Sequence, residues 1–312
     1  MQLVRLGRTN AMVSVAGLGC GGASRLGMAR GESVDHAAGI VRRALDLGIT
    51  FIDTARAYGT EEAVGKGIAG RRDQVFLSTK ASPGWGDDLL SAAGLAESLD
   101  GSLKRLGTDH IDVMHLHGVR PRQYDYCIAE LLPELKRQQA AGKIRFLGIT
   151  EQFGGDTRHE MLSRALPDDH FDVVMTGFSL INPSARRTVF PLTRKHDVGT
   201  LIMFAVRRQL SQPDALRETV AALIAEGSVD PAVVDAADPL GWLAGRSDVA
   251  GVVEAAYRFC RHEPGADVIL TGTGSAEHLD ANVRAILAPR LPREVLDRLD
   301  AAFGKVDSVS GN

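Results

Sequence analysis

The segment that decides the interpretation of this chain is Phe51-Ile52-Asp53-Thr54-Ala55-Arg56-Ala57-Tyr58-Gly59-Thr60-Glu61-Glu62-Ala63-Val64-Gly65-Lys66-Gly67-Ile68-Ala69-Gly70. It begins as a short apolar strand, places Asp53 at the end of that strand and puts Tyr58 in the following loop. A helix is expected next, with Thr60 as its N-cap and two glutamates in its first turn, where the helix dipole favours negative charge. A carboxylate and a phenol therefore leave the same strand end together.

Strands and helices alternate along the rest of the chain. Eight short apolar strands are expected at 15–22, 50–53, 74–80, 111–117, 144–150, 171–178, 199–205 and 266–270. Helices are expected at 33–47, 89–106, 128–141, 158–165, 185–195, 276–286 and 292–303, with a longer, mostly helical stretch at 213–259. A hairpin with its turn at 7–10 is expected ahead of these units.

This alternation predicts the fold class. Strands that alternate with helices form a parallel sheet with helical crossovers. An open, doubly wound sheet is the rival arrangement, but eight units without a linker favour a closed barrel. We therefore expect one α/β domain over residues 1–312, a (β/α)8 TIM barrel with an N-terminal hairpin and extra C-terminal helices.

Composition limits the class of protein. The 312 residues carry a formal net charge of −3, so no basic surplus points to nucleic acid. No apolar run reaches the roughly 18 residues of a membrane span. The cysteines, Cys20, Cys127 and Cys260, are odd in number and far apart, which favours a reducing, cytoplasmic setting without a disulfide framework.

Polar residues cluster at the ends of three successive expected strands. Asp53 and Tyr58 follow the second strand, while Lys80 ends the third and His117 the fourth. In a barrel these ends converge on one pocket, where Asp53 and Lys80 are expected to pair because buried charges need partners. An ammonium close to Tyr58 would lower the pKa of the phenol and let it act as a general acid at neutral pH. The set suits hydride addition to a carbonyl, because a nearby acid must protonate the alkoxide.

The chain resembles the aldo-keto reductase family over nearly its whole length. The segment Asp53-Thr54-Ala55 through Tyr58-Gly59 is similar to the family's Asp and Tyr segment, Thr79-Lys80 to its lysine strand, and Asp112-Val113-Met114-His115-Leu116-His117 to its histidine strand. The resemblance implies an oxidoreductase that uses NADPH, or NADH, to reduce aldehydes or ketones to alcohols, or the reverse. Tyr58 would be the acid, Lys80 and Asp53 would tune it, and His117 would orient the carbonyl.

The resemblance also implies where the cofactor binds. Thr150-Glu151 stands where the family commonly has Ser-Asn, Met175 where it has Gln, and Met203 or Phe204 where an aromatic stacks on nicotinamide. The segment 270–275 resembles the adenosine-phosphate segment, although no Lys or Arg lies within 271–275 to meet a 2′-phosphate. The assigned cofactor-binding residues are Gly19, Cys20, Gly21, Asp53, Thr150, Glu151, Met175, Met203, Phe204, Gly272, Thr273, Gly274, Ser275 and Asn282.

Substrate contacts are expected from residues that surround the reacting groups. Tyr58, His117 and Trp85 are assigned to the substrate. Arginines on the loops after the strands favour a charged or polyhydroxylated carbonyl compound, such as a sugar. These arginines are Arg25, Arg30, Arg120, Arg122, Arg207 and Arg208.

Three other interpretations stay open. His115 and His117 are two residues apart and share one strand face, so with Asp53 and Glu151 they could bind the metal of a barrel hydrolase. Lys80 could form a Schiff base, as in aldolases. The chain could also be a non-catalytic cofactor-binding subunit. The favoured interpretation expects no metal.

Overall fold

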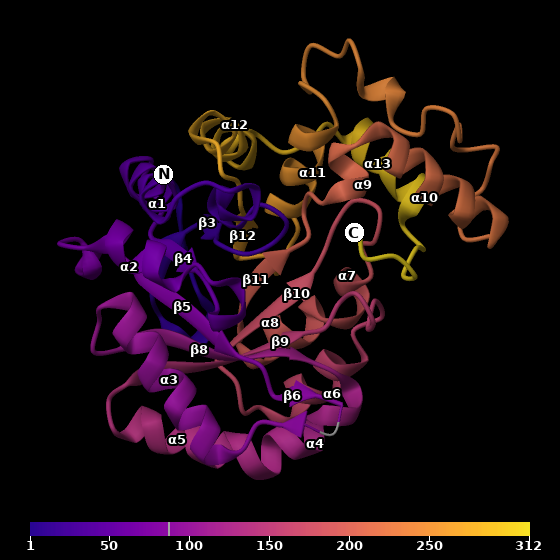
Figure 1. Ribbon diagram of the computed structural model, residues 1–312. Helices are drawn as coiled ribbons and strands as arrows, with labels where there is room; N and C mark the ends of the chain where they lie inside the picture. Colours follow the sequence, from indigo (N-terminus) through magenta and orange to yellow (C-terminus); the bar gives the residue numbers. More distant parts are fainter. Residues whose placement is uncertain (87) are drawn as a thin grey trace.

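The computed structural model describes residues 1–86 and 88–312, and within them eight parallel strands close into a barrel (Figure 1). The strands are arranged around the barrel in the order β10-β11-β12-β3-β4-β5-β8-β9. Their bounds are β3 Ala16–Gly19, β4 Phe51–Asp53, β5 Phe76–Ala81, β8 Ile111–Val119, β9 Ile144–Glu151, β10 Val173–Gly177, β11 Gly199–Met203 and β12 Val268–Thr271. The predicted (β/α)8 barrel is confirmed.

Helices connect the strands and pack around the outside of the barrel (Figure 1). Their bounds are α1 Val34–Asp46, α2 Glu61–Ile68, α3 Ala92–Leu106, α4 Tyr124–Tyr126, α5 Leu132–Ala140, α6 Glu160–Asp168, α7 Ala185–Thr188, α8 Phe190–His196, α9 Arg208–Ser211, α10 Pro213–Ala225, α11 Val252–Arg261, α12 Ala276–Leu287 and α13 Arg293–Phe303. Each helix in the described residues is too short or too polar to span a bilayer.

The N-terminal hairpin closes one end of the barrel. β1 (Leu3–Arg5) pairs antiparallel with β2 (Met12–Ser14), as predicted. Leu6 and Val13 pack with the inward-facing residues of the strands, including Phe51 and Val113, in an apolar cluster inside the barrel. This interior is a filled core, so the reacting groups lie at the opposite, carboxyl end of the strands.

One local expectation is wrong, and another holds for position but not for the hydrogen bond. Residues 213–259 are helical only in α10 and in α11, because Pro, Asp and Gly residues interrupt the segment between these two helices. That segment holds one short 3-10 turn, Gly241–Leu243, and lies at the periphery of the molecule (Figure 1). Thr60 occupies the N-cap position of α2, but its hydroxyl lies 2.9 Å from that of Thr54 and makes no capping hydrogen bond. A small hairpin, β6 (Gly84–Trp85) with β7 (Asp88–Leu89), was not predicted.

Candidate active site

The structure brings Asp53, Tyr58, Lys80 and His117 together at the carboxyl end of the barrel. Asp53 ends β4, Lys80 lies near the end of β5, and His117 lies near the end of β8. Tyr58 comes from the 3-10 turn Arg56–Tyr58 that follows β4. Asp53 and Lys80 are buried, whereas Tyr58 and His117 are half-buried. The two inner groups therefore support the two outer ones, which face the barrel mouth.

Lys80 and Asp53 form a buried ion pair. The ammonium donates hydrogen bonds to Asp53 Oδ1 and Oδ2, each 2.6 Å long, and to the carbonyl of Thr54 at 2.7 Å. The Ser78 hydroxyl donates to the same carboxylate at 2.8 Å. Burial alone would lower the pKa of Lys80, but the Asp53 carboxylate prevails and raises it above its ordinary value. Lys80 therefore remains a cation at neutral pH.

Tyr58 and His117 lie next to each other above this pair. The phenol oxygen is 3.3 Å from His117 Nε2, and the two rings meet edge to face with centroids 5.4 Å apart. The Lys80 ammonium is 4.9 Å from the centroid of the Tyr58 ring. Burial, followed by the charge of Lys80, lowers the pKa of His117 to about 3. The imidazole is therefore neutral at physiological pH and exchanges a hydrogen bond with the phenol or with a bound carbonyl.

The expected lowering of the pKa of Tyr58 is wrong. Burial raises the pKa of Tyr58, and the cations Lys80 and Arg207 offset only part of that effect. The sequence indicated the nearby ammonium but not how far packing would desolvate the phenol. A raised pKa keeps the phenol protonated at neutral pH, which is the form that a proton donor needs.

The loop after β3 lies directly against the reacting phenol. A Cβ on Gly21 would lie 2.6 Å from Cε2 of Tyr58, so any side chain there would displace the Tyr58 ring. Gly19 is half-buried and faces the same end of the barrel. Cys20 contributes backbone alone, because its side chain packs in the core between barrel and helices. The loop thus presents main-chain atoms beside Tyr58, which agrees with the expected approach of a ligand.

The segment after β12 has the features of a phosphate-binding turn. The Ser275 hydroxyl accepts a hydrogen bond from His278 N at 3.2 Å and caps α12, whose N-terminal amides and dipole favour an anion. A Cβ on Gly272 would lie 2.4 Å from the carbonyl of Gly19, and one on Gly274 only 2.5 Å from Gly27. The two glycine loops therefore pack tightly against each other beside the barrel mouth. These features fit a dinucleotide phosphate.

Other predicted cofactor positions have partners inside the protein. Asn282 Nδ2 donates to Thr271 Oγ1 at 2.9 Å, and Thr273 Oγ1 accepts from the backbone N of Ser275. Thr150 Oγ1 accepts from the backbone N of Gly118 at 2.7 Å, so this hydroxyl holds the chain next to His117. These hydroxyls and amides fix the walls of the site, a role that the sequence did not indicate.

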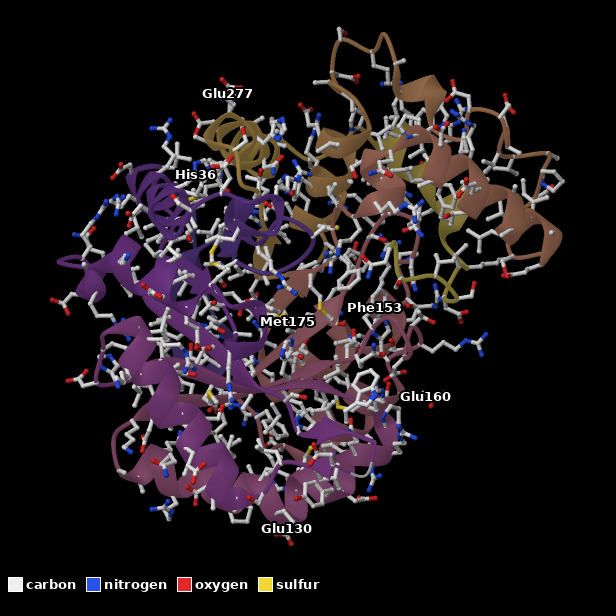
Figure 2. The ribbon with its side chains drawn as sticks, in the orientation of Figure 1. His36, Glu130, Phe153, Glu160, Met175 and Glu277 are labelled. Atoms are coloured by element: carbon white, nitrogen blue, oxygen red, sulfur yellow. The ribbon has the colours of Figure 1, made fainter. Side chains whose placement is uncertain are left out.

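Met175 lies deeper in the barrel than a cofactor-contacting side chain would. It is buried in the apolar interior cluster, and Figure 2 shows it in the middle of the barrel. The next inward-facing position on β10 is Gly177, where a Cβ would lie 2.2 Å from the ring of Phe153. Phe153, from the loop after β9, therefore covers the top of β10 and was missed by sequence reasoning.

Glu151 belongs to a buried hydrogen-bond network. Its carboxylate lies 2.9 Å and 3.0 Å from His159 Nδ1 and accepts from Thr176 Oγ1 and the backbone N of Gly177. His159 Nε2 lies 2.9 Å from Ser184 Oγ, which donates to Asn182. Each of these side chains is buried. The carboxylate is saturated by these partners and is not directed at the tetrad, so the predicted contact of Glu151 with a carboxamide has no support here.

The residues after β11 form an aromatic and cationic cluster. Phe204 has φ of 69°, an uncommon conformation for a bulky residue. Its ring meets that of Phe153 edge to face at 5.5 Å, and the guanidinium of Arg207 stacks on it at 4.0 Å. Met203 is half-buried beside the interior cluster. Arg208, which follows Arg207, is exposed.

Trp85 lies on the small β6–β7 hairpin after β5. Its side chain is 72% exposed, and the guanidinium of Arg120 stacks on its ring at 3.8 Å. An exposed tryptophan at the strand ends suits contact with a ligand, so the assignment of Trp85 to the substrate stays a prediction.

The groups around the tetrad do not suit the metal or Schiff-base chemistry. No set of three or more His, Cys, Asp or Glu that could hold a metal occurs in the described residues. His115 is buried beneath the tetrad, and burial followed by the charge of Lys80 lowers its pKa well below the ordinary value. A Schiff base needs a neutral, accessible amine. Lys80 is instead a buried cation.

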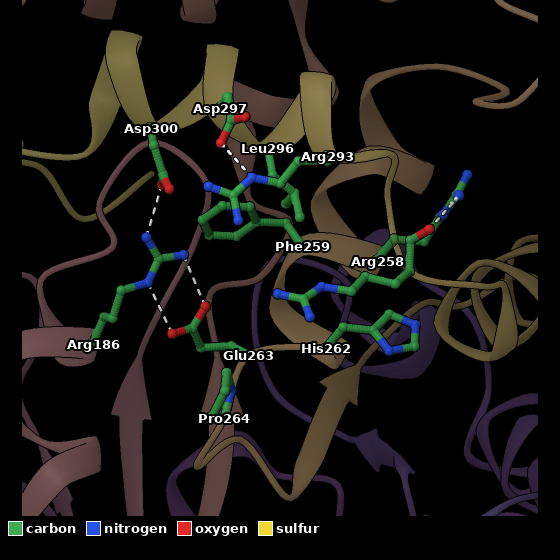
Figure 3. A pocket seen from close by; sticks show the side chains of 11 residues that line it. Arg186, Arg258, Phe259, His262, Glu263, Pro264, Arg293, Leu296, Asp297 and Asp300 are labelled. Carbon is green, nitrogen blue, oxygen red and sulfur yellow. Dashed lines mark hydrogen bonds and ion pairs between the residues drawn. The ribbon is translucent and has the colours of Figure 1, made fainter.

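A cavity of about 170 Å³ lies outside the barrel, among residues of α7, α11 and α13 (Figure 3). The guanidinium of Arg186 donates there to both carboxylate oxygens of Glu263 at 2.8 Å and to Oδ1 of Asp300 at 2.7 Å. Arg258 donates to the carbonyls of Pro289 and Asp248. Acidic side chains and backbone carbonyls of the protein itself accept the hydrogen bonds of these two guanidinium groups. We therefore interpret the cavity as a packing gap between helices.

Comparison with known proteins decides the family. The model of the Aldo/keto reductase family matches residues 18–303. The aldo-keto reductase YhdN of Bacillus subtilis is 32% identical over 77% of this chain and 76% of its own length. The chain belongs to the aldo/keto reductase family. It is therefore an NAD(P)H-dependent oxidoreductase that interconverts carbonyl and alcohol groups.

Solved aldo/keto reductases share the fold. The holo form of AKR11C1 from Bacillus halodurans superposes with a TM-score of 0.75 at 24% identity, covering 100% of both chains. An aldo/keto reductase of Klebsiella pneumoniae, solved in complex with NADP and acetate, superposes with a TM-score of 0.67 at 24% identity and covers 98% of this chain and 97% of its own. At this identity the likeness establishes the architecture of the barrel.

Proposed function

We propose that this aldo/keto reductase reduces an aldehyde or ketone to an alcohol, or catalyses the reverse, with Tyr58 as the proton donor. The observation that carries the proposal is the position of the phenol. Its oxygen lies 3.3 Å from His117 Nε2, and its ring lies 4.9 Å from the Lys80 ammonium. A carbonyl oxygen that enters this corner meets a protonated acid and a neutral imidazole.

The roles of the four residues follow from their environments. Tyr58 donates a proton to the carbonyl oxygen as negative charge develops there, and its raised pKa keeps that proton in place until then. The phenolate that remains lies beside the Lys80 cation, which stabilises it. Asp53 keeps Lys80 charged and fixed by two hydrogen bonds. His117, neutral near physiological pH, offers a hydrogen bond that orients the carbonyl.

We further propose NADPH as the preferred cofactor. The capped N-terminus of α12 and the glycines of segment 272–275 would hold its adenosine phosphates, and Phe204 and Met203 would lie near its nicotinamide. When bound, the cofactor supplies a hydride to the carbonyl carbon. The preference over NADH rests on the family, since 271–275 carries no Lys or Arg.

We also propose a cytoplasmic setting. Cys20, Cys127 and Cys260 are all free and buried, an arrangement that suits a reducing compartment.

Two measurements on the purified protein test these proposals. A fluorescence titration with NADPH and with NADH gives both dissociation constants, and consumption of NADPH in the presence of a neutral aldehyde gives turnover. Tight binding of NADPH, weaker binding of NADH and turnover of the aldehyde are expected. Binding of neither nucleotide would overturn the proposed chemistry, while equal binding would overturn the proposed preference alone.

A further inference from the structure

Arg207 is a half-buried cation at the mouth of the barrel, and the described part of the chain places no counter-ion beside it. No carboxylate in residues 1–86 or 88–312 lies within ion-pair distance of its guanidinium, and within those residues Tyr58 is the only charged or titratable partner that acts on it. By contrast, the half-buried Arg72 and Arg186 and the buried Arg258 each pair with an acidic residue. Removing a cation from water without pairing it is costly, so an anion that binds beside this guanidinium would offset that cost.

The guanidinium is held in one place by its surroundings. Its flat face stacks on the ring of Phe204 at 4.0 Å, and Phe204 is itself braced by Phe153. A Cβ on Gly311 would lie 3.6 Å from Cβ of Arg207, so the C-terminal residues pack against the stem of the side chain. The backbone N of the neighbouring Gln209 also donates to the carbonyl of Gly311. A fixed fork of donors costs less entropy to bind an anion than a mobile side chain does.

Two consecutive glycines place this fork next to the reacting phenol. A Cβ on Gly21 would lie 2.6 Å from the ring of Tyr58, and a Cβ on Gly22 would lie 2.9 Å from Nη1 of Arg207. Neighbouring Cα atoms are about 3.8 Å apart, so the phenol and the guanidinium occupy adjoining positions along one stretch of backbone. A small molecule bound at Tyr58 can therefore reach Arg207.

We propose that Arg207 binds an anionic group of the substrate, so that this enzyme prefers carbonyl compounds that carry a carboxylate or phosphate close to the reacting carbonyl. This inference rests on the proposed function and deepens it, because the same Tyr58 acts on the carbonyl. Arg207 forms charge-assisted, bidentate hydrogen bonds to the anion and thereby turns the carbonyl oxygen toward Tyr58 and His117. A phosphate of the cofactor shares this anion chemistry, so the test separates the two sources.

The test compares matched charged and neutral substrates. The three isomeric carboxybenzaldehydes and their methyl esters differ in charge while the aldehyde stays the same. The enzyme is expected to turn over at least one acid with a higher kcat/KM than its ester. Arg207→Gln is expected to lower this acid-to-ester ratio roughly 10- to 100-fold, the range for loss of a hydrogen bond to a charged group. Arg207→Lys, which keeps the charge but not the fork, is expected to give an intermediate ratio.

The matched control is Arg208→Gln, which removes the same charge from the exposed neighbouring residue and is expected to leave the ratio unchanged. The dissociation constant of NADPH, measured for each variant, is expected to stay within about twofold, and this binding also shows that the variants are folded. An unchanged acid-to-ester ratio in Arg207→Gln overturns the inference. Weaker NADPH binding with an unchanged ratio assigns Arg207 to the cofactor phosphates and overturns it too. Turnover of neither acid nor ester by the wild-type enzyme overturns the proposed function itself.

Discussion

Removing one partner of the Lys80–Asp53 ion pair is expected to destabilise the protein strongly. Lys80 donates three hydrogen bonds of 2.6, 2.6 and 2.7 Å, and neither side chain has more than 4% exposure in the pair. Breaking a buried pair by removing one partner costs about 3–5 kcal/mol, because the remaining charge has no compensation. Lys80→Met and Asp53→Asn should therefore each lower the free energy of unfolding by this amount. The double variant buries no charge at this position, so it should lose at least about 2 kcal/mol less than the sum of the single variants.

Urea unfolding followed by circular dichroism near pH 7 measures these free energies from the midpoint and the slope. Arg293→Gln is the control, because Arg293 and Asp297 form an exposed pair and should contribute nothing measurable. Single variants within about 1 kcal/mol of the wild type, or strictly additive effects in the double variant, would refute the reasoning, since either result is typical of a solvated pair.

Three further predictions concern pH and packing. The kcat/KM for carbonyl reduction should stay constant from about pH 5 to about pH 9, because burial lowers the pKa of His117 to about 3 and raises that of Tyr58. A change in kcat/KM with a midpoint near pH 6.5 that disappears in His117→Gln would contradict this prediction. Gly21→Ala should lower kcat at least roughly 10-fold with little loss of stability, because the new methyl group displaces Tyr58. The control is Gly39→Ala, whose methyl group meets open space and should leave kcat unchanged. Equal kcat values for the two variants would contradict the close contact between Gly21 and Tyr58. Burial raises the pKa of Asp267 to about 6, so its folded carboxyl holds a proton more tightly than the unfolded one, and stability is lost as pH rises from about 4 to about 6. Asp267→Asn should therefore gain about 1–3 kcal/mol relative to the wild type between pH 4 and pH 8 in urea titrations, and a constant difference across that range would exclude the effect.

The sequence predicted the barrel because its information is local. Each strand is a short apolar run and each helix an amphipathic one, so the alternation is visible without knowledge of the contacts. The placement of Asp53, Lys80 and His117 at strand ends followed from the same pattern, since carboxyl ends of barrel strands meet. The stretch 226–251 was harder, because its apolar residues suggested helix while its Pro, Asp and Gly residues prevent one.

Features that depend on long-range packing could not be predicted. The Glu151–His159–Ser184 network joins the end of β9 to residues that precede α6 and α7, and only the folded chain shows that Glu151 is already satisfied. The pKa of Tyr58 depends on burial, which the order of residues does not reveal. Arg207 was one of several loop arginines in the sequence. Its place beside Gly22, and the lack of a counter-ion for it among residues 1–86 and 88–312, became apparent in the structure.

The conformation of Phe204 is a further example. Its positive φ turns the chain after β11 so that the ring meets Phe153 and carries Arg207. A bulky residue in this region of backbone space is strained, and such strain is often found at binding sites. No sequence rule places an aromatic residue there. One signal that the sequence did offer was the pair Gly21-Gly22, which allows the close approach of side chains from two other loops.

The most direct test of the account is the turnover of Tyr58→Phe with NADPH and a neutral aldehyde, measured together with its dissociation constant for NADPH. The phenylalanine keeps the ring and removes only the acid. The account predicts a fall in kcat of roughly 10²- to 10⁴-fold, the usual contribution of a positioned proton donor, with NADPH binding unchanged. A kcat within about threefold of the wild type, with binding intact, would show that the proton comes from another group and would contradict the central claim.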